Sequence, residues 1–373
     1  MSDFEAIRTE FPITQTCAFL NHAAAGPIPL RARDAVHELL TDHTEKAVTN
    51  HAAWVADQDT IRARVARLVN GDKNGVSFVQ NTSSGLSLAA NGIQWKPGDN
   101  VIVPACEFPS NIYPWMNLEH LGVELRRIDT PLGYAKPEDI EAAINPRTRA
   151  VSISFVQFSN GYRNQLAALG EICRRRGPLF VVDGTQGVGA LRLDVAQCGI
   201  DLLAVSGHKW MLSPFGIGFT HCSQRALGAL RVPVVGWLSV NEPFEFRYEL
   251  ELRDNATRFE AGTENAGGIA GLGASLELME ELGETRVENR VLDLTDLLCE
   301  GLRSCGCTVH SARQPDTRSG IVVFTSTRHD TESLHRLFLS NDIVCSVRSG
   351  GIRLSPHYYN NESEIERVID LLK

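Results

Sequence analysis

The sequence predicts an α/β fold in which a mainly parallel sheet lies between two helical layers, followed by a smaller α+β unit. Two patterns indicate this class. Short apolar runs alternate with helical segments in the first part of the chain, and polar and apolar residues do not alternate within these runs. Such strands are typical of parallel sheets, because helices cover both of their faces. The expected strands are 76–79, 101–103, 150–155, 179–182 and 202–205.

Length and composition fit this organisation. The chain has 373 residues, which corresponds to two or three folding units, and 43% of its residues are hydrophobic. Acidic residues outnumber basic residues by 45 to 36, and the formal net charge of −9 opposes contact with the phosphates of nucleic acids or of anionic membranes. We therefore expect neither a nucleic acid nor a membrane as a partner.

The cysteines and the N-terminus indicate a cytoplasmic protein. Nine cysteines, an odd number, are scattered between residues 17 and 345 and do not form the dense even set of a disulfide framework. The first residues lack the basic and apolar regions of a signal peptide, and no stretch of 18 apolar residues follows. Cys305 and Cys307 have no second ligand pair at metal-binding spacing, so we expect no metal.

A second unit is expected after a loop-rich stretch that follows residue 213. Helical spacing resumes there, and two apolar runs then flank a helix that begins near Asp330. The helical spacing covers 266–303, and the apolar runs are 320–326 and 343–348. We therefore expect a large α/β domain over 18–262 and a small α+β domain over 263–373, to which the N-terminal arm 1–17 also belongs.

Polar residues follow two neighbouring predicted strands. Asp183 ends one strand, and Ser206, His208 and Lys209 follow the next. Ligand sites of open α/β sheets lie at these carboxyl ends, so we expect a carboxylate and an amine to face one crevice. Pyridoxal 5′-phosphate (PLP) needs such a pair, since a lysine holds its aldehyde as a Schiff base and an acid keeps its ring nitrogen protonated. We expect the pKa of Lys209 to be lowered by desolvation and by the cationic ring.

A phosphate anchor is expected at the start of the helix that follows the first strand. Thr82 and Ser83 open this helix. The unpaired N–H groups and the dipole of a helix N-terminus attract anions, and the two hydroxyls add donors. Ser206 and His208 complete the expected phosphate site.

Several sequence blocks resemble the class V aminotransferase family of fold-type I PLP enzymes, which includes the cysteine desulfurases. These blocks are FLNHAAAGPIP at 19–29, VDGTQ at 182–186, SGHKW at 206–210 and RFEAGT at 258–263, and the resemblance covers nearly the whole chain. It implies that residues 18–262 bind PLP.

The resemblance also implies roles for single residues. Lys209 is the lysine that carries the Schiff base, Asp183 is the partner of the pyridine nitrogen, and Gln186 donates a hydrogen bond to the phenolic oxygen. Thr82, Ser83, Ser206 and His208 hold the phosphate, and His208 also belongs to the expected catalytic set with Lys209 and Asp183. Thr263 reaches the phosphate of the other subunit in the family, which implies a homodimer whose two chains build each site.

The segment CEFPSNIYPW resembles the part of the family that stacks an aromatic residue on the cofactor ring, and Phe108 stands at that position. Cysteine desulfurases usually carry a histidine there, whereas phenylalanine stacks without transferring protons. In VQFSNG, Phe158 occupies the position at which the family often has an asparagine near the ring oxygen. Gln157 and Asn160 remain as possible substitutes, and the predicted cofactor-binding set includes Gln157.

The C-terminal segment resembles the region that binds the substrate carboxylate. The planar guanidinium of arginine suits a carboxylate, and Arg353 is the expected clamp, with Arg348 as the second candidate. His22 and Ala24 in the N-terminal block are further candidates for contact with the substrate.

The residues leave the reaction on a small L-amino acid open between transamination, β-elimination with C–S cleavage, and epimerisation of the isopenicillin N epimerase type. An inactive PLP-binding protein is a further alternative. The segment before Arg353 lacks the loop that carries the persulfide-forming cysteine of desulfurases, and Cys345 lies in an apolar run. We therefore expect an aminotransferase or C–S lyase, and not a persulfide-forming cysteine desulfurase.

Overall fold

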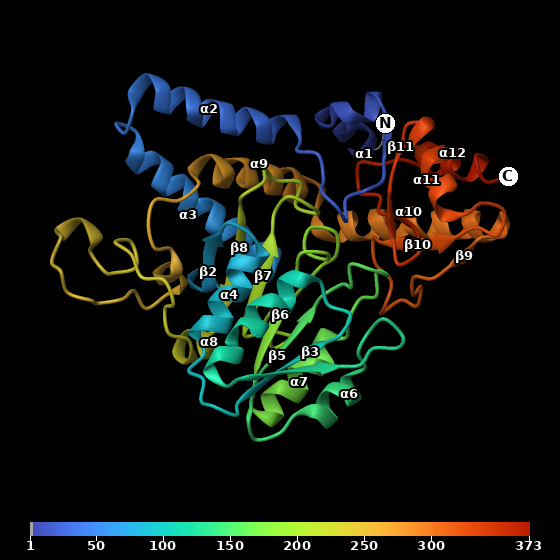
Figure 1. The fold of residues 1–373 in the computed structure, drawn as a ribbon. Coiled ribbons are helices and arrows are strands. Elements are labelled where there is room, and N and C mark those ends of the chain that lie inside the picture. The colour runs from blue at the N-terminus through green and yellow to red at the C-terminus, as the bar shows by residue number, and fades with distance from the viewer. Residues whose placement is uncertain (1–2) are drawn as a thin grey trace.

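The computed structural model describes residues 3–373 and is built around one seven-stranded sheet (Figure 1). The strand order is β2-β8-β7-β6-β5-β3-β4. The strands are β2 (Val76–Val79), β3 (Asn100–Pro104), β4 (Glu124–Ile128), β5 (Thr148–Ser154), β6 (Leu179–Asp183), β7 (Leu202–Ser206) and β8 (Gly218–Cys222). All neighbours pair in parallel except β8, which is antiparallel to both β2 and β7. The predicted mainly parallel sheet is confirmed.

The sheet is the middle layer of three, because successive residues of its strands enter different cores. Ile102, Val182 and Leu203 belong to one hydrophobic cluster, and their neighbours Val101 and Val181 belong to another. The first cluster also contains residues of helices α3 (His51–Leu68), α7 (Leu166–Arg176), α9 (Ala266–Leu282) and α10 (Glu284–Ser304). The second contains residues of helices α4 (Thr82–Gly92), α5 (Tyr113–Met116) and α8 (Gln224–Ala229). Burial on both faces explains why the strands show no alternation of polarity.

The helices lie on both faces of this sheet and around the C-terminal unit (Figure 1). They are α1 (Asp3–Ile7), α2 (Leu30–Lys46), α3 (His51–Leu68), α4 (Thr82–Gly92), α5 (Tyr113–Met116), α6 (Pro137–Ala143), α7 (Leu166–Arg176), α8 (Gln224–Ala229), α9 (Ala266–Leu282), α10 (Glu284–Ser304), α11 (Thr331–Ser340) and α12 (Glu362–Asp370). The helical pattern predicted over 266–303 forms two helices, since Gly283 between them has a φ of +83°.

A second sheet belongs to the C-terminal unit and has the order β12-β13-β10-β9. Its strands are β9 (Thr308–Val309), β10 (Val322–Thr325), β12 (Ser346–Arg348) and β13 (Gly351–Leu354). Asp330 caps α11 through a bond from the Ser333 N–H (2.9 Å), which confirms the predicted helix start.

The N-terminal part of the chain packs on this C-terminal unit. Strand β1 (Ala18–Phe19) pairs with β11 (Ile343–Val344), and the Ser355 N–H donates to the Leu20 carbonyl at 2.7 Å. The boundaries placed at 17/18 and 262/263 stay predictions. Within residues 3–373, no helix has both the length and the apolar composition that crossing a bilayer requires.

Candidate active site

A cavity of about 270 Å³ lies where β6 and β7 end and α4 begins. Asp183 is the last residue of β6, Ser206 is the last residue of β7, and Lys209 follows three positions later. The cavity therefore occupies the carboxyl edge of the sheet, as the sequence predicts. The predicted site residues that line it are Ala24, Thr82, Ser83, Phe108, Asp183, Gln186, Ser206, His208 and Lys209.

Hydroxyl groups converge at the N-terminus of α4. The Thr82 N–H donates to Ser206 Oγ at 2.8 Å, and the hydroxyls of these two residues lie 2.7 Å apart. Thr82 also bonds to the hydroxyl of Thr185, a residue of the VDGTQ block that sequence reasoning missed. Ser83 Oγ donates to Ser110 Oγ at 2.8 Å. Because the helix dipole also favours anions here, this wall fits a phosphate.

Asn81 is the N-cap residue of α4. Its side-chain oxygen accepts the Ser84 N–H at 3.0 Å, which is the bond of a helix N-cap. Asn81 lines the cavity as well. The strand-to-helix turn after β2 therefore fixes the direction of the first turn of α4 beside the cavity.

Asp183 is buried, and burial raises the pKa of its carboxyl, although the bond from the Thr185 N–H at 2.9 Å and the charge of Lys209 act in the opposite direction. A cationic ring nitrogen beside this carboxyl would restore its charged form. The carboxyl thus fits the acid that PLP needs at its ring.

The Lys209 amine has a pKa of about 8, well below that of a free lysine. Burial is the largest cause, and the positive charges of Arg353 and Arg348 add to it, while Asp183 opposes them. Its Nζ lies 5.4 Å from the centre of the Phe108 ring. An amine with this pKa is neutral often enough near pH 7 to attack an aldehyde, so the residues of this cavity fit PLP.

His208 and Phe108 form aromatic parts of the same wall. Burial lowers the pKa of His208 to about 4, so its ring is neutral near pH 7, and it stacks on Phe215 with ring centres 5.1 Å apart. Phe108 contacts Phe158 edge-on at 5.1 Å. Phe158 lines the cavity, in agreement with its position near the ring oxygen in the family resemblance. Ser110 and Ser154 line it as well, and no sequence motif pointed to these two residues.

Gln157 is not brought to the cavity, contrary to its prediction as a cofactor ligand. Its side chain is fully buried, and its Nε2 donates to the Glu107 carboxylate at 2.7 Å. Because Phe158, the next residue, lines the cavity, Gln157 turns inward. Asn160 is also directed elsewhere, since its Nδ2 donates to the Gly133 carbonyl at 3.0 Å.

His22 is a structural residue here, and its predicted contact with the substrate is not supported. The ring is fully buried. Its Nδ1 lies 2.8 Å from the Ser355 carbonyl and therefore donates to it, so Nε2 accepts the Tyr359 hydroxyl at 2.7 Å. Both ring nitrogens are thus occupied.

The two predicted arginines lie beside this cavity on the β12–β13 hairpin and do not line it. Arg353 is 2% exposed, and its guanidinium donates to the Phe158 carbonyl (2.9 Å) and to Ser346 Oγ (3.2 Å). Burial, with the charge of Arg348, lowers its pKa to about 10. No ion pair recorded within residues 3–373 includes Arg353, so a buried cation lacks an anion here. Arg348 is exposed.

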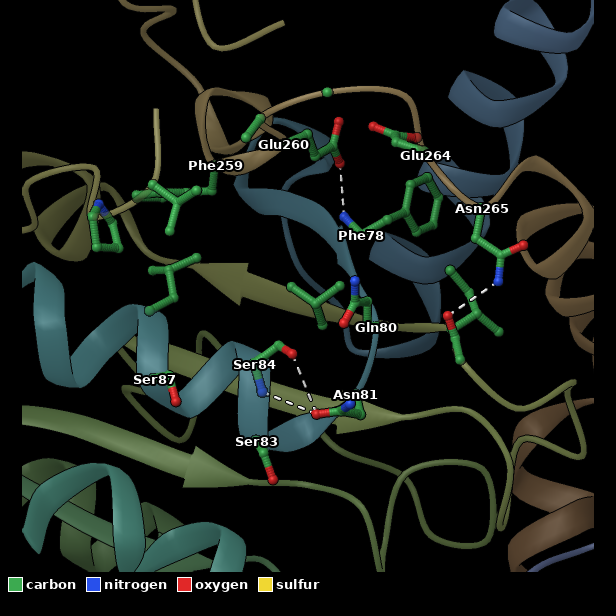
Figure 2. A pocket seen from close by; sticks show the side chains of 18 of the residues that line it. Phe78, Gln80, Asn81, Ser83, Ser84, Ser87, Phe259, Glu260, Glu264 and Asn265 are labelled. Carbon is green, nitrogen blue, oxygen red and sulfur yellow. Dashed lines mark hydrogen bonds between the residues drawn. The ribbon is translucent and has the colours of Figure 1, made fainter. Parts of the chain in front are cut away.

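Thr263 lines a second, larger cavity of about 1,090 Å³. Asn81 and Ser83, which are labelled in Figure 2, line this cavity as well. Thr263 is exposed and does not line the cavity that contains Lys209. Near it, burial and the neighbouring carboxyl of Glu260 raise the pKa of Glu264 to about 9. The two cavities are therefore adjacent at the start of α4.

Fold and cavity together define a PLP-dependent enzyme of fold type I that acts on an amino acid. The Aminotransferase class-V family matches residues 18–368. The chain belongs to this family.

Named relatives cover nearly the whole chain. It is 31% identical to a protein named cysteine desulfurase from Klebsiella pneumoniae, over 98% of this chain and 96% of that one. It is 29% identical to a probable cysteine desulfurase from Methanothermobacter thermautotrophicus, over 99% and 97% of the two chains. The apo structure of a cysteine desulfurase from Thermococcus onnurineus has the same fold, with a TM-score of 0.89 at 24% identity over 99% and 96% of the chains.

These relatives correct the reaction expected from the sequence. The expectation that the chain is an aminotransferase or C–S lyase, and not a cysteine desulfurase, is wrong, and the epimerase and the inactive binder are equally unsupported. The expectation of a reaction other than cysteine desulfuration rested on Phe108 and on the short segment before Arg353. In the structure this segment is a two-residue turn at 349–350 that joins β12 to β13. The short turn and the Phe108 ring affect a small part of the site, whereas the similarity to the named relatives extends over nearly the whole chain.

Proposed function

We propose that the protein is a cysteine desulfurase that uses PLP to remove the sulfur of L-cysteine. L-Cysteine and an acceptor thiol would give L-alanine and a persulfide of that thiol. The observation that carries the proposal is the buried Lys209 amine, whose pKa is about 8 and which shares one cavity with Asp183. The substrate is proposed from the relatives, which are named cysteine desulfurases.

The residues of the cavity divide into those that hold PLP and those that tune it. We assign the aldehyde to Lys209 and the ring nitrogen to Asp183. We assign the phosphate to the N-terminus of α4 and to the side chains of Thr82, Ser83, Ser206 and His208. Thr185, which bonds to Thr82, belongs to the same phosphate site. Phe108 covers the ring. Bound PLP supplies an electron sink for the pair released when a bond at the amino acid's α-carbon breaks.

Lys209 is also the group proposed to move protons. Its free Nζ would be an amine with a pKa near the working pH, which suits a general acid and base. His208 is neutral, and Phe108 has no proton to transfer. Arg353 would bind the substrate carboxylate, because its buried guanidinium lacks an acidic partner.

Product analysis tests the proposal. The holoenzyme is incubated with L-cysteine and dithiothreitol, and L-alanine, sulfide, pyruvate and ammonia are measured. We expect one alanine per sulfide. Lys209→Ala should abolish turnover, whereas Lys136→Ala, an exposed lysine, should leave it unchanged. Pyruvate with ammonia in place of alanine, or a keto acid that retains the sulfur, would contradict the proposal.

We also propose a homodimer in which Thr263 of one chain contributes to the phosphate site of the other. Its support is that Thr263 is exposed on the larger cavity, which shares Asn81 and Ser83 with the smaller one. Hybrids of Lys209→Ala and Thr263→Ala chains are the test, because a site shared between chains leaves one intact site per hybrid. We expect activity to rise on mixing at limiting PLP. If Thr263 served its own chain, no intact site would exist and mixing would restore nothing.

The cytoplasm is the proposed compartment. All nine cysteines are free thiols in the structure, which suits a reducing environment. Alkylation of the protein in intact cells, followed by mass spectrometry, should label accessible cysteines such as Cys106 without prior reduction.

A further inference from the structure

We propose that Trp210 is a positioning residue that sets the orientation of the Gln186 side-chain amide. The Trp210 indole Nε1 donates to Gln186 Oε1 at 2.9 Å. Gln186 is buried and lines the cavity that contains Lys209, and Trp210 is fully buried directly after that lysine in the chain. The inference rests on the proposed role of Gln186 as a donor to the phenolic oxygen of PLP.

Donor and acceptor chemistry allows one orientation of this amide. An indole nitrogen only donates, so the amide oxygen must face Trp210. The amide nitrogen of Gln186 then donates one hydrogen to the Ala23 carbonyl at 2.9 Å. In the reverse orientation two donors would face each other at Trp210, and two carbonyl oxygens at Ala23. Each of these pairings would leave a buried polar group without a bond.

This orientation leaves an N–H for the cofactor. A side-chain amide nitrogen carries two hydrogens, and within residues 3–373 the Gln186 nitrogen has one recorded acceptor, the Ala23 carbonyl. The second hydrogen belongs to a group on the wall of the cavity. Trp210, together with the Ala23 carbonyl, therefore determines that Gln186 offers PLP a donor and not a carbonyl oxygen.

Trp210 is itself held by the C-terminal segment. Its carbonyl lies 2.8 Å from His357 Nε2, and His357 Nδ1 accepts the Tyr358 N–H at 2.8 Å, so Nε2 carries the hydrogen and donates. The indole also packs against Gly320, where an added Cβ would come within 2.6 Å of the ring. The indole N–H is therefore fixed in direction by residues far along the chain.

The bound chromophore reports on this donor. An N–H that faces the phenolic oxygen stabilises its anionic form and so lowers the pKa that visible absorption follows. Trp210→Phe keeps an aromatic ring, removes the indole N–H and so removes one of the two bonds that fix the Gln186 amide. We expect the absorbance midpoint of the holoenzyme to rise by about one pH unit.

Two comparisons separate positioning from packing. Trp95→Phe removes another indole N–H, which donates to the Ala90 carbonyl at 2.7 Å, and should leave the midpoint unchanged. In the Gln186→Ala background, Trp210→Phe should produce no further shift, because the amide that it orients is gone. A role in packing alone would lower the melting temperature without moving the midpoint.

Several results would overturn the inference. These are an unchanged midpoint in Trp210→Phe, a shift that persists at full size without the Gln186 amide, or a Gln186→Ala variant that titrates like the wild type. If the phenylalanine variant does not fold, benzothienylalanine at position 210 keeps the bicyclic shape without the N–H and makes the same test. The titration needs no turnover, so a failure of the desulfurase proposal would be seen separately, in the product analysis.

Discussion

The cavity contains an acidic and a basic side chain, and burial favours the neutral form of both. Burial raises the pKa of the Asp183 carboxyl and lowers the pKa of the Lys209 amine to about 8. Because the cavity shields Asp183 from water, the charged form of its carboxyl is favoured only when a cation lies beside it. The electronic role proposed for Asp183 follows from this dependence.

Asp183→Asn tests this role at the level of one atom. The amide keeps the shape and can accept the Thr185 N–H, but it cannot hold a ring nitrogen protonated. We expect cofactor to remain bound while kcat falls by roughly 100-fold or more, measured by alanine formation and absorbance.

Asp201→Asn is the matched control for Asp183→Asn. Asp201 is also buried, and it pairs with Arg225 at 2.8 Å just before the start of β7, at the end of the strand away from the cavity. Its replacement should lower the melting temperature and leave the kcat of the remaining folded enzyme unchanged. If Asp183→Asn kept the wild-type kcat, the assignment of Asp183 as the partner of the ring nitrogen would be wrong.

Residue types at strand ends were predictable from the sequence, but the directions of neighbouring side chains were not. The motif blocks place Lys209, Asp183 and Gln186 in the cavity as predicted. Gln157 and Phe158 are adjacent, and the Gln157 amide turns inward to the buried Glu107 carboxylate, a partner 50 residues away that no local pattern reveals. The partners of His22 lie more than 330 residues away in the chain, so no local pattern could identify that ring as structural.

At the scale of elements, α4 carries the anion-binding end of the site. Asn81→Ala removes the cap that accepts the Ser84 N–H. We expect a loss of about 1 kcal/mol in the free energy of unfolding, and weaker PLP binding because the first-turn N–H groups lose their fixed direction. Urea denaturation of the apoprotein and equilibrium dialysis with PLP measure the two effects.

The cap of another helix provides the comparison. Asn361 caps α12, and its side chain accepts the Glu364 N–H at 3.2 Å. Asn361→Ala should cost a similar amount of stability and leave the affinity for PLP unchanged. Equal losses of affinity in the two variants would mean that the α4 cap has no specific connection with the cofactor.

The sequence predicted the strands that consist mainly of apolar residues and missed two others. The five expected strands consist mainly of apolar residues, and they include the edge strand β2. Strands β4 and β8 were not predicted, because β4 contains charged residues and β8 begins with glycine. The break between α9 and α10 at Gly283 interrupts an otherwise continuous helical pattern. A left-handed φ at one glycine is not visible in the spacing of apolar residues.

At the scale of the whole molecule, buried neutral histidines limit stability in acid. Burial lowers the pKa of His221 to about 4, against a weak opposing effect of Asp72, and both of its ring nitrogens lack a recorded partner within residues 3–373. Above pH 6.5 the ring is neutral in both folded and unfolded chains. Between 6.5 and 4 only the unfolded chain binds the proton, so stability falls as the pH falls.

His221→Leu should remove this part of the acid sensitivity. Between pH 6.5 and 4 the wild type should lose on the order of 3 kcal/mol more than the variant, judged from urea denaturation at several pH values. His310→Leu, which replaces an exposed histidine, should keep the wild-type slope. Parallel pH profiles for the wild type and His221→Leu would contradict the explanation.

The pairing of β1 with β11 and the bond from the Ala23 N–H to Ser355 Oγ at 3.0 Å have a consequence for biosynthesis. The cavity wall formed by Ala24 depends on residues near the end of the chain. A nascent polypeptide still attached to the ribosome lacks this support until β11 and Ser355 have been synthesised. Coenzyme capture in the completed pocket is therefore a late event, after synthesis of the C-terminal unit.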